Sequence, residues 1–526
     1  MLLIGELLLD NAENYPDRFA VITKERCLTY RELNRESNCV ANALKKLGLK
    51  RGDCLAFLMK NSIEWVIAWY ACQKLGVVCM PLHARLLPEE LARCIKIAGC
   101  KAIIYQEGFS DSICAIENRF CRLETKICVG SEINTDKDSN IIKWMDLYNN
   151  ADYSEAQENL ENDSPAVLLF TSGTTGNPKG VLRTQEMITL HGITLAIRNC
   201  SPHLCDILLS TAPLYHIGGL QTLLKMLVLG GTYATYNTIE PDEILGMIDR
   251  HKVTQLQMLP PITYERLYRS YKTGNYDLSS VWEVCISAGK CTLEYTDHIF
   301  EMFPVCHLRP SWGSTETCSV TCMQLTREDL QEHPEMINSI GTIMPFTMVH
   351  VVNDDGTEVM PGESGEALVK SPMVFNGYMH DMDCGCPSCF TEDGWFKTGD
   401  IVRVDPNTGC FYFQDRIKDI IKTGGETIYA LEVERMVEKY PAVYECAAIG
   451  IPDERFGEAV GIAVVPNKGY SINAKDLVQF CNSHMARFKK PRYLAIMDRL
   501  PENSTGKIAK NVLREKYICD FRPIEL

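Results

Sequence analysis

The chain has 526 residues, of which 46% are hydrophobic and 23% charged, as in an ordinary globular protein. This length allows a sizeable core and roughly three or four domains, or one large body with subdivisions. The net charge of −15 argues against a general nucleic-acid-binding protein, so we expect small-molecule partners and no nucleic acid.

No apolar run approaches the roughly 20 residues that a membrane helix needs. The N-terminal stretch MLLIGELLLDNAENYPD is interrupted by Glu6 and Asp10 and lacks a positively charged start, so it predicts an amphipathic helix. Most of the 24 cysteines stand singly in apolar segments, as Cys72 and Cys285 do, and are expected to be reduced core residues. We therefore expect a cytoplasmic protein without membrane insertion, and a homo-oligomer stays open.

Strands and helices begin to alternate after Thr29. That residue is expected to cap a helix that ends before Gly48. Beyond it the pattern predicts, in order, a strand at 54–59, a helix at 63–75, a strand at 77–80, a helix at 88–98 and a strand at 102–105. Such alternation predicts a parallel sheet with helices on both faces.

The segment Leu168–Gly180, LLFTSGTTGNPKG, carries the most distinctive chemistry in the chain. Ala166–Phe170 predicts a short buried strand that runs into a loop of glycines and hydroxyls. The glycines let the backbone approach a ligand, and the hydroxyls and Lys179 supply donors, so we interpret the loop as a polyphosphate cradle. No hydroxyl follows Lys179 to hold magnesium, which argues against a P-loop kinase or GTPase. A polar surface turn is the alternative.

The alternation then resumes, with strands expected at 207–211, 232–236, 254–259 and 284–287. We therefore predict two similar α/β halves. Between the first two of these strands, the stretch LYHIGG places His216 at a strand end beside flexible backbone. A structural histidine is the alternative at that position.

The pattern changes near Met348 to short strands with turns at 353–356 and 405–409, which predicts a smaller β-rich subdomain. Beyond Asp415 an α+β segment is expected, with strands near 445–450 and 460–465 and a helix near 474–485. We place the boundary at residues 414–418. The predicted domains are an N-terminal domain, residues 1–414, and a C-terminal lid, residues 415–526.

Two further stretches offer groups that could bind a nucleotide. SWGSTET, Ser311–Thr317, combines an aromatic plate for a base with the carboxylate of Glu316 for a cation. TGD, Thr398–Asp400, supplies a carboxylate that could accept two ribose hydroxyls. The alternatives are a loop N-cap and a common turn.

Two stretches near the C-terminus carry charge beside glycine. DRIKDIIKTGGE, residues 415–426, offers Arg416 and the pair Gly424 and Gly425. NSTGKIAK, residues 503–510, places Lys507 beside a glycine. A solvated hairpin and a surface lysine are the alternatives.

Together and in this order, these stretches resemble the adenylate-forming superfamily of acyl-CoA synthetases, peptide-synthetase adenylation domains and beetle luciferases. The resemblance runs from about Thr29 to Lys510 and is carried by TSGTTGNPKG, SWGSTE, TGD, DRIKD and STGK. It implies an α/β fold whose large N-terminal body holds two parallel-sheet subdomains and a β-rich subdomain, with a small α+β lid. It also implies ATP, Mg²⁺, coenzyme A and a small carboxylic acid as ligands.

The resemblance implies roles for individual residues. The phosphate loop would bind the β- and γ-phosphates, Thr315 would reach the α-phosphate, and Glu316 would assist Mg²⁺. Trp312 stands where the family usually has a tyrosine stacked on adenine, and Asp400 with Arg416 looks like the ribose pair. The nucleotide-binding residues implied are Thr171, Ser172, Gly173, Thr174, Thr175, Lys179, Gly289, Lys290, Ser311, Trp312, Gly313, Asp400 and Arg416.

Three more assignments concern the two chemical steps. Lys507 resembles the mobile lysine that bridges the carboxylate and the α-phosphate, and His216 matches a position beside the acyl carboxylate. Lys418 falls at the hinge position, while Gly424 and Gly425 are implied to approach the thiol channel of coenzyme A. A rotating lid would deliver Lys507 for the first step and withdraw it for the second.

The predicted reaction joins an acid to ATP, giving acyl-AMP and pyrophosphate, and then transfers the acyl group to coenzyme A. HARLL, GGE and MARFKKPRYL resemble carnitine or crotonobetaine-CoA ligases and other bacterial acid-CoA ligases. The acid could therefore be carnitine-like or another small to medium organic or fatty acid. The alternatives are an enzyme that loads a carrier protein and a non-catalytic adenylate-binding protein.

One cluster departs from the family pattern: His380, Cys384, Cys386 and Cys389. These ligand types suit a tetrahedral zinc site. Because the CxCxxC spacing is tight, a cysteine-rich variable loop is the alternative, and we do not include the cluster among the predicted sites.

Overall fold

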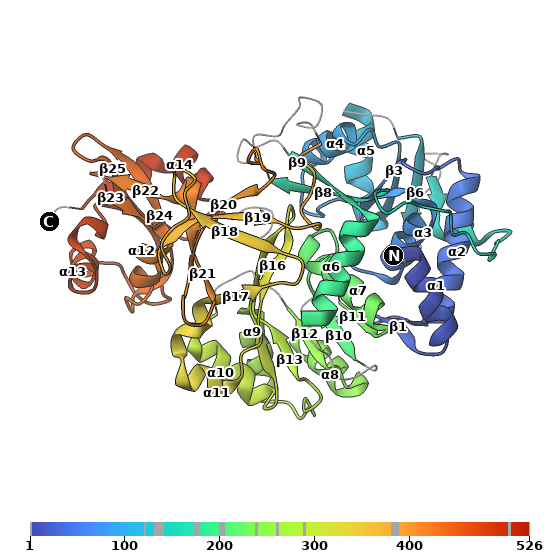
Figure 1. Cartoon of the computed structure of the whole chain (residues 1–526), viewed down its shortest axis with the longest axis horizontal. Coiled ribbons are helices and arrows are strands. Elements are labelled where there is room, and N and C mark those ends of the chain that lie inside the picture. The colour runs from blue at the N-terminus through green and yellow to red at the C-terminus, as the bar shows by residue number, and fades with distance from the viewer. Residues whose placement is uncertain are drawn as a thin grey trace. The chain divides into compact units, whose positions relative to one another are not determined.

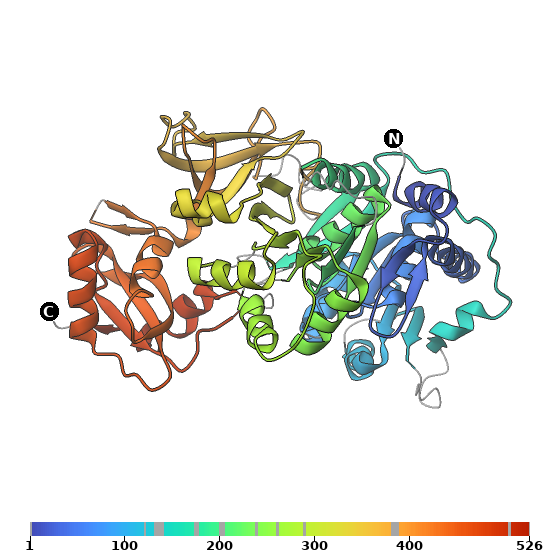
Figure 2. The same ribbon diagram turned by 90° about the horizontal axis from the view of Figure 1, so that it is seen from below.

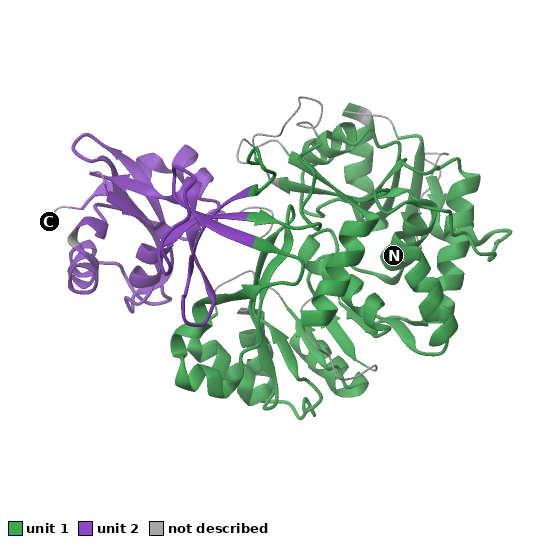
Figure 3. Cartoon of the chain, viewed as in Figure 1, with its two compact units in different colours: residues 1–348, 369–396 green, residues 349–368, 397–526 purple. Residues whose placement is uncertain are grey.

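The computed structural model describes residues 3–119, 123–130, 141–172, 178–198, 206–236, 240–258, 262–287, 291–379, 389–424, 426–502 and 507–524. The chain divides into two compact units: unit 1 is residues 1–348 with 369–396, and unit 2 is residues 349–368 with 397–526 (Figure 3). The predicted domain limits, 1–414 and 415–526, concern rotation about a hinge. The two compact units do not bear on such a rotation, so these limits stay a prediction.

The first sheet of unit 1 holds the expected strands after Thr29 together with the strand before the phosphate loop. Its described strands lie in the order β7-β6-β5-β3-β4-β8-β9 and run parallel except for β9, which pairs antiparallel with β8. They are β3 (Cys54–Leu58), β4 (Val78–Pro81), β5 (Ala102–Gln106), β6 (Thr125–Val129), β7 (Ile141–Lys143), β8 (Pro165–Ser172) and β9 (Pro178–Thr184).

The second sheet has the order β14-β13-β12-β10-β11-β1-β2 and is parallel except for β1 with β2. Two α/β halves are therefore present, but β1 and β2 come from the N-terminus, so the second half is not one continuous segment. The strands are β1 (Phe19–Ile22), β2 (Cys27–Thr29), β10 (Ile207–Ser210), β11 (Thr232–Thr235), β12 (Gln255–Gln257), β13 (Glu283–Cys285) and β14 (His307–Arg309).

The helices predicted after Thr29, at 63–75 and at 88–98 are present, with limits that agree to within one residue. Thr29 caps α2, its side chain accepting the Glu32 N–H, and Gly48 beyond its end has a φ of +93°. The described helices of unit 1 are α1 (Ile4–Asn14), α2 (Tyr30–Lys46), α3 (Ile63–Leu75), α4 (Pro88–Ile97), α5 (Ser110–Arg119), α6 (Gln185–Arg198), α7 (Ile217–Leu229), α8 (Pro241–His251), α9 (Ile262–Tyr271), α10 (Leu293–Met302) and α11 (Arg327–Glu332). Among the described residues, none of the helices is long and apolar enough to cross a membrane.

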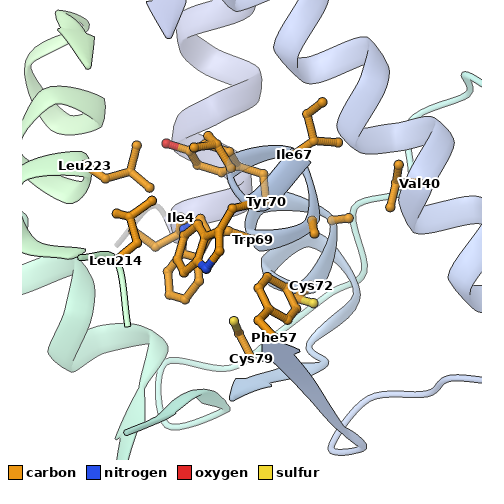
Figure 4. Packing of buried hydrophobic residues seen from close by; sticks show 14 of the residues in the cluster. Ile4, Val40, Phe57, Ile67, Trp69, Tyr70, Cys72, Cys79, Leu214 and Leu223 are labelled. Atoms are coloured by element: carbon orange, nitrogen blue, oxygen red, sulfur yellow. The ribbon is translucent and has the colours of Figure 1, made fainter. Parts of the chain in front are cut away.

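Alternate strand residues enter different layers of the core. In β3, Phe57 packs in the cluster that contains α3, while Leu58 packs in the cluster that contains α4. In β11, Tyr233 belongs to that same α3 cluster, and Ala234 faces the cluster that contains α8. The α3 cluster thus joins both sheets, with α2, α3 and α7 between them (Figures 1, 2 and 4). Burial on both faces explains the continuously apolar strands.

The strands β15 (Ser311–Ser314), β16 (Cys318–Cys322) and β17 (Ser339–Ile343) of unit 1 pair antiparallel and precede residue 348. The change of pattern predicted near that residue is present as a run of further strands. The β-rich segment consists of β18 (Met348–Val352), β19 (Ser364–Lys370), β20 (Phe396–Val404) and β21 (Phe411–Arg416).

The α+β segment predicted beyond Asp415 is confirmed. Its central antiparallel pair, β24 (Val443–Asp453) and β25 (Gly457–Pro466), contains the strands expected at 445–450 and 460–465. The other elements are β22 (Ile421–Thr423), β23 (Glu426–Ile428), α12 (Ala430–Val437), α13 (Ala474–His484), β26 (Tyr493–Ile496), α14 (Lys510–Lys516) and β27 (Arg522–Pro523).

Candidate functional site

The phosphate loop joins β8 to β9. Thr171 lies opposite Lys179 in the register of this hairpin, and the backbone of Ser172 ends β8. Gly173, Thr174 and Thr175 lie outside the described residues, so the structure places the two ends of the loop. The Lys179 ammonium lies 4.5 Å from the ring centre of Tyr378, which is within the range of a cation–π interaction.

A tight turn between β15 and β16 carries Thr315 and Glu316. The Ser314 N–H donates to Thr317 Oγ1 at 3.0 Å, and the Glu316 N–H donates to Ser314 Oγ at 3.2 Å. Cys318, at the end of the turn, has a φ of +60°, which is unusual for a residue other than glycine. A Cβ on Gly313 would lie 1.8 Å from the Cys318 carbonyl oxygen, so the turn requires glycine there.

Tyr378 connects this turn to the hairpin of the phosphate loop. Its hydroxyl donates to Glu316 Oε1 at 2.8 Å, while its ring contacts Lys179. The backbone is tied in the same way, because the Phe375 N–H donates to the Glu316 carbonyl and the Met379 N–H donates to the Gly180 carbonyl, both at 2.9 Å. Sequence reasoning missed Tyr378, since an Asn-Gly-Tyr triplet is too common to indicate a site.

The residues present fit an Mg²⁺ ion that is held mainly by phosphate. Glu316 is nearly buried, and the Tyr378 hydroxyl orients its carboxylate. Within the described ranges, no group of three or more His, Cys, Asp and Glu side chains could hold a metal. One carboxylate beside a polyphosphate loop is a usual donor set for Mg²⁺, which commonly keeps substrate phosphates and waters as ligands.

Ser311 and Trp312 lie on β15, next to the end of β13. The Ser311 N–H donates to Ser287 Oγ at 2.9 Å, and the two serine hydroxyl oxygens are 2.8 Å apart. These bonds fix the strand that presents Trp312. Gly289 and Lys290, which continue the chain after Ser287, lie outside the described residues.

His216 begins the N-terminal turn of α7 in a cluster of three rings. The ring centres of His83 and Tyr215 are 4.6 Å apart, and His216 lies 4.8 Å from Tyr215 and 5.2 Å from His83. The Arg85 N–H donates to His83 Nδ1 at 3.0 Å, so His83 can donate from Nε2. Burial raises the pKa of Tyr215, and Arg85 opposes that shift.

Unit 2 contains the predicted ribose pair and Lys507. Asp400 and Arg416 are partners in the β20–β21 register, with Arg416 Nε 3.0 Å from Asp400 Oδ1. Desolvation lowers the pKa of Lys507, Arg416 lowers it further, and Asp400 opposes the shift. Although Lys507 as a whole is exposed, its ammonium is therefore close enough to both residues of the pair to sense their charges.

The predicted hinge and thiol-channel residues also lie in unit 2. Lys418 is in a 3₁₀ turn, Ile417–Asp419, directly after β21, and partial burial lowers its pKa. Gly424 has a φ of +58°, and its N–H donates to the Phe456 carbonyl at 2.9 Å. Gly425 lies outside the described residues.

The predicted site residues thus form two groups, one in each unit. Of the cysteine-rich cluster that was not included among the predicted sites, His380, Cys384 and Cys386 lie outside the described residues, so a zinc site there stays untested. Unit 1 holds Thr171, Ser172, Lys179, His216, Ser311, Trp312, Gly313, Thr315 and Glu316, and unit 2 holds Asp400, Arg416, Lys418, Gly424 and Lys507.

Comparison with known proteins identifies the family. Residues 8–379 match the AMP-binding enzyme family, and residues 432–507 match the AMP-binding enzyme C-terminal domain. The chain belongs to the AMP-binding enzyme family.

Its relatives extend over nearly the whole chain. It is 30% identical over 508 residues to 2-succinylbenzoate–CoA ligase of Bacillus licheniformis, covering 96% of this chain and 98% of that protein. Indoleacetate–CoA ligase of Aromatoleum aromaticum is 29% identical over 507 residues, 95% of each chain.

Two solved structures share the fold. ATP-bound MatB from Rhodopseudomonas palustris has a TM-score of 0.85 at 27% identity, covering 98% of this chain and 99% of that one. The o-succinylbenzoate–CoA synthetase of Bacillus subtilis with ATP and a magnesium ion has a TM-score of 0.81 at 27% identity, covering 97% and 99%.

These matches confirm the predicted superfamily, the α/β fold with a small C-terminal domain, and the enzyme class, an AMP-forming acid–thiol ligase. They equally confirm ATP, Mg²⁺ and coenzyme A as the ligands of that class. The roles of individual residues stay predictions.

Proposed function

We propose that the protein joins a carboxylic acid to coenzyme A through an acyl-AMP intermediate. The observation that carries this proposal is that Tyr378 contacts both Lys179, at one end of a glycine- and hydroxyl-rich loop, and the carboxylate of Glu316, which its hydroxyl orients. That combination suits a nucleoside triphosphate with Mg²⁺.

In the first step, an oxygen of the acid carboxylate attacks the α-phosphorus of ATP. A bond forms between that oxygen and phosphorus, and the bond to the β-phosphate oxygen breaks, so that pyrophosphate leaves. We propose that Lys179 and Thr171 hold the β- and γ-phosphates, that Thr315 contacts the α-phosphate, and that Glu316 holds Mg²⁺. When bound, Mg²⁺ neutralises negative charge on the phosphates. Catalysis here is positioning and electrostatic stabilisation, and no protein nucleophile is required.

In the second step, the thiol of coenzyme A attacks the acyl carbon and AMP leaves. Lys507 is proposed to bridge the carboxylate and α-phosphate in the first step only, while Gly424 and Gly425 approach the thiol in the second. A rotation of the C-terminal lid near Lys418 would exchange these roles.

The acid is proposed to be carnitine- or crotonobetaine-like, or another small to medium organic or fatty acid. The rings of His83, Tyr215 and His216 are the candidate wall beside its carboxyl end. The curated relatives are named for indoleacetate and 2-succinylbenzoate, so aromatic acids belong in any test.

The test incubates purified full-length protein with ATP, Mg²⁺ and a panel of carnitine-like, aliphatic, aromatic and dicarboxylic acids, with and without coenzyme A. We expect acid-dependent pyrophosphate release, and an acyl-CoA product when coenzyme A is added. Pyrophosphate release without acyl-CoA would favour a carrier protein as acceptor. No release with any acid would favour a non-catalytic adenylate-binding protein.

A further inference from the structure

Arg183 is fully buried on β9, four residues beyond Lys179. Its Nη1 donates to the Thr315 carbonyl at 2.7 Å and lies 3.4 Å from the Glu316 carbonyl, and its Nη2 donates to the Met373 carbonyl. One guanidinium thus ties the phosphate-loop strand to the turn that carries Thr315 and Glu316. It also reaches the segment that leads to Tyr378.

The hydrogen-bond acceptors of Arg183 are neutral backbone carbonyls, which is unusual for a buried arginine. In the described part of the chain no carboxylate pairs with Arg183, whereas buried Arg309 has Glu283 at 3.0 Å and buried Lys74 pairs with Glu155. Buried charges are normally paired, because desolvating a charge is costly. The carbonyl dipoles satisfy Nη1 and Nη2, whereas the buried Nε has no hydrogen-bond partner in the described part of the chain, and the net positive charge stays in place.

A second group nearby responds to this charge. His191 on α6 is fully buried, and its pKa is lowered to about 3, first by burial and then by the positive charge of Arg183. His191 is therefore neutral at ordinary pH and adds no second positive charge.

We propose that Arg183 is a positioning residue for Mg²⁺–ATP: it holds the Thr315–Glu316 turn against the phosphate-loop strand and supplies an uncompensated positive charge beneath the polyphosphate. The planar guanidinium can bond the Thr315 and Met373 carbonyls at the same time, which the single ammonium of a lysine does less well. Arg183 acts through the turn and through its field. It is not proposed to touch the nucleotide.

This inference rests on the proposed function, because it assumes a polyphosphate at the loop. The test therefore measures nucleotide binding alone, by calorimetry on the full-length protein without any acid. The ligands are ATP with Mg²⁺, ATP with a chelator, and AMP. If the wild type binds none of them, the proposed function fails and this inference fails with it.

For Arg183→Met we expect Mg²⁺–ATP affinity to fall by about tenfold or more and most of the advantage of Mg²⁺ over chelated ATP to disappear. AMP, which lacks the β- and γ-phosphates, should lose less affinity than Mg²⁺–ATP does. Arg183→Lys keeps the charge and should give an intermediate loss of about three- to tenfold.

Lys74→Met is the matched control. It removes another buried cation of unit 1, which pairs with Glu155 and contacts none of the residues of the Thr315–Glu316 turn named above. It should lower the melting temperature and leave the affinity for Mg²⁺–ATP unchanged. The inference is overturned if folded Arg183→Met binds Mg²⁺–ATP within about threefold of wild type, or loses no more affinity than Lys74→Met. If Arg183→Met does not fold, Arg183→Lys decides by the same threefold limit.

Discussion

Tyr378 contributes to the site in two ways, and these can be separated by mutation. Its hydroxyl orients Glu316, and its ring faces Lys179. Tyr378→Phe removes the hydroxyl and keeps the ring. A hydrogen bond to a charged group is worth about 1.5–3 kcal/mol, so pyrophosphate release should slow by about 10- to 100-fold, with a higher Mg²⁺ requirement.

The measurement is initial pyrophosphate release as a function of Mg²⁺ concentration. Tyr268→Phe is a suitable control, since it deletes a similar tyrosine–carboxylate bond, 2.6 Å long, to Glu301 on an exposed surface. An unchanged Mg²⁺ dependence in Tyr378→Phe would show that the hydroxyl does not orient a magnesium-binding carboxylate.

At the scale of residues, sequence reasoning succeeded where the chemistry is local. Thr29 and Gly48 were predictable as helix boundaries because capping depends on neighbouring residues. Tyr378 and Arg183 were not, because their partners lie 62 and 132 residues away in the sequence. A single sequence carries no signal for such pairs, and both residue types are common in cores and loops.

Close packing in the turn between β15 and β16 is expected to support both folding and nucleotide binding. Gly313→Ala would place a methyl group 1.8 Å from the Cys318 carbonyl oxygen, so the backbone must move. We expect the free energy of unfolding to fall by about 1–3 kcal/mol. We also expect ATP affinity to fall by a larger fraction of its wild-type value than the free energy of unfolding does. Thermal unfolding and calorimetric ATP binding check both effects.

Gly246→Ala is the control for this substitution. Gly246 lies within α8, and no atom lies within 4 Å of an added Cβ, so alanine should be neutral or slightly stabilising. If Gly313→Ala behaves like Gly246→Ala in both measurements, the close packing of the turn has no role in nucleotide binding.

The type of most helices and strands, and most of their first and last residues, could be predicted from the hydrophobic period and the turn residues, as for α3 at 63–75. Sheet membership did not follow. β1 joins the second sheet beside β11, about 210 residues later, although the sequence order favours the first sheet. Pairing between distant strands depends on the shared α3 cluster, where Phe57 and Tyr233 meet in one core. Local patterns do not encode that association.

For the whole molecule, the proposal of a rotating lid predicts opposite effects of two substitutions. Lys507→Ala should slow acyl-AMP formation by about 100-fold or more, the scale of one lost charged donor, and spare thioester formation from supplied acyl-AMP. Lys418→Pro should spare acyl-AMP formation and slow thioester formation, because proline fixes φ at the hinge. Both half-reactions are measured on both variants. Equal damage to the two steps in Lys507→Ala would contradict the lid mechanism.

Isotope transfer shows whether the acid becomes bonded to AMP before it meets the thiol. The acid identified in the panel is labelled with ¹⁸O in both carboxyl oxygens and converted with ATP, Mg²⁺ and coenzyme A, and the products are analysed by mass spectrometry. Because a carboxylate oxygen attacks the α-phosphorus and stays there when the thiol displaces AMP, we expect one ¹⁸O in AMP and none in pyrophosphate. Unlabelled AMP, or ¹⁸O found in inorganic phosphate, would contradict this mechanism.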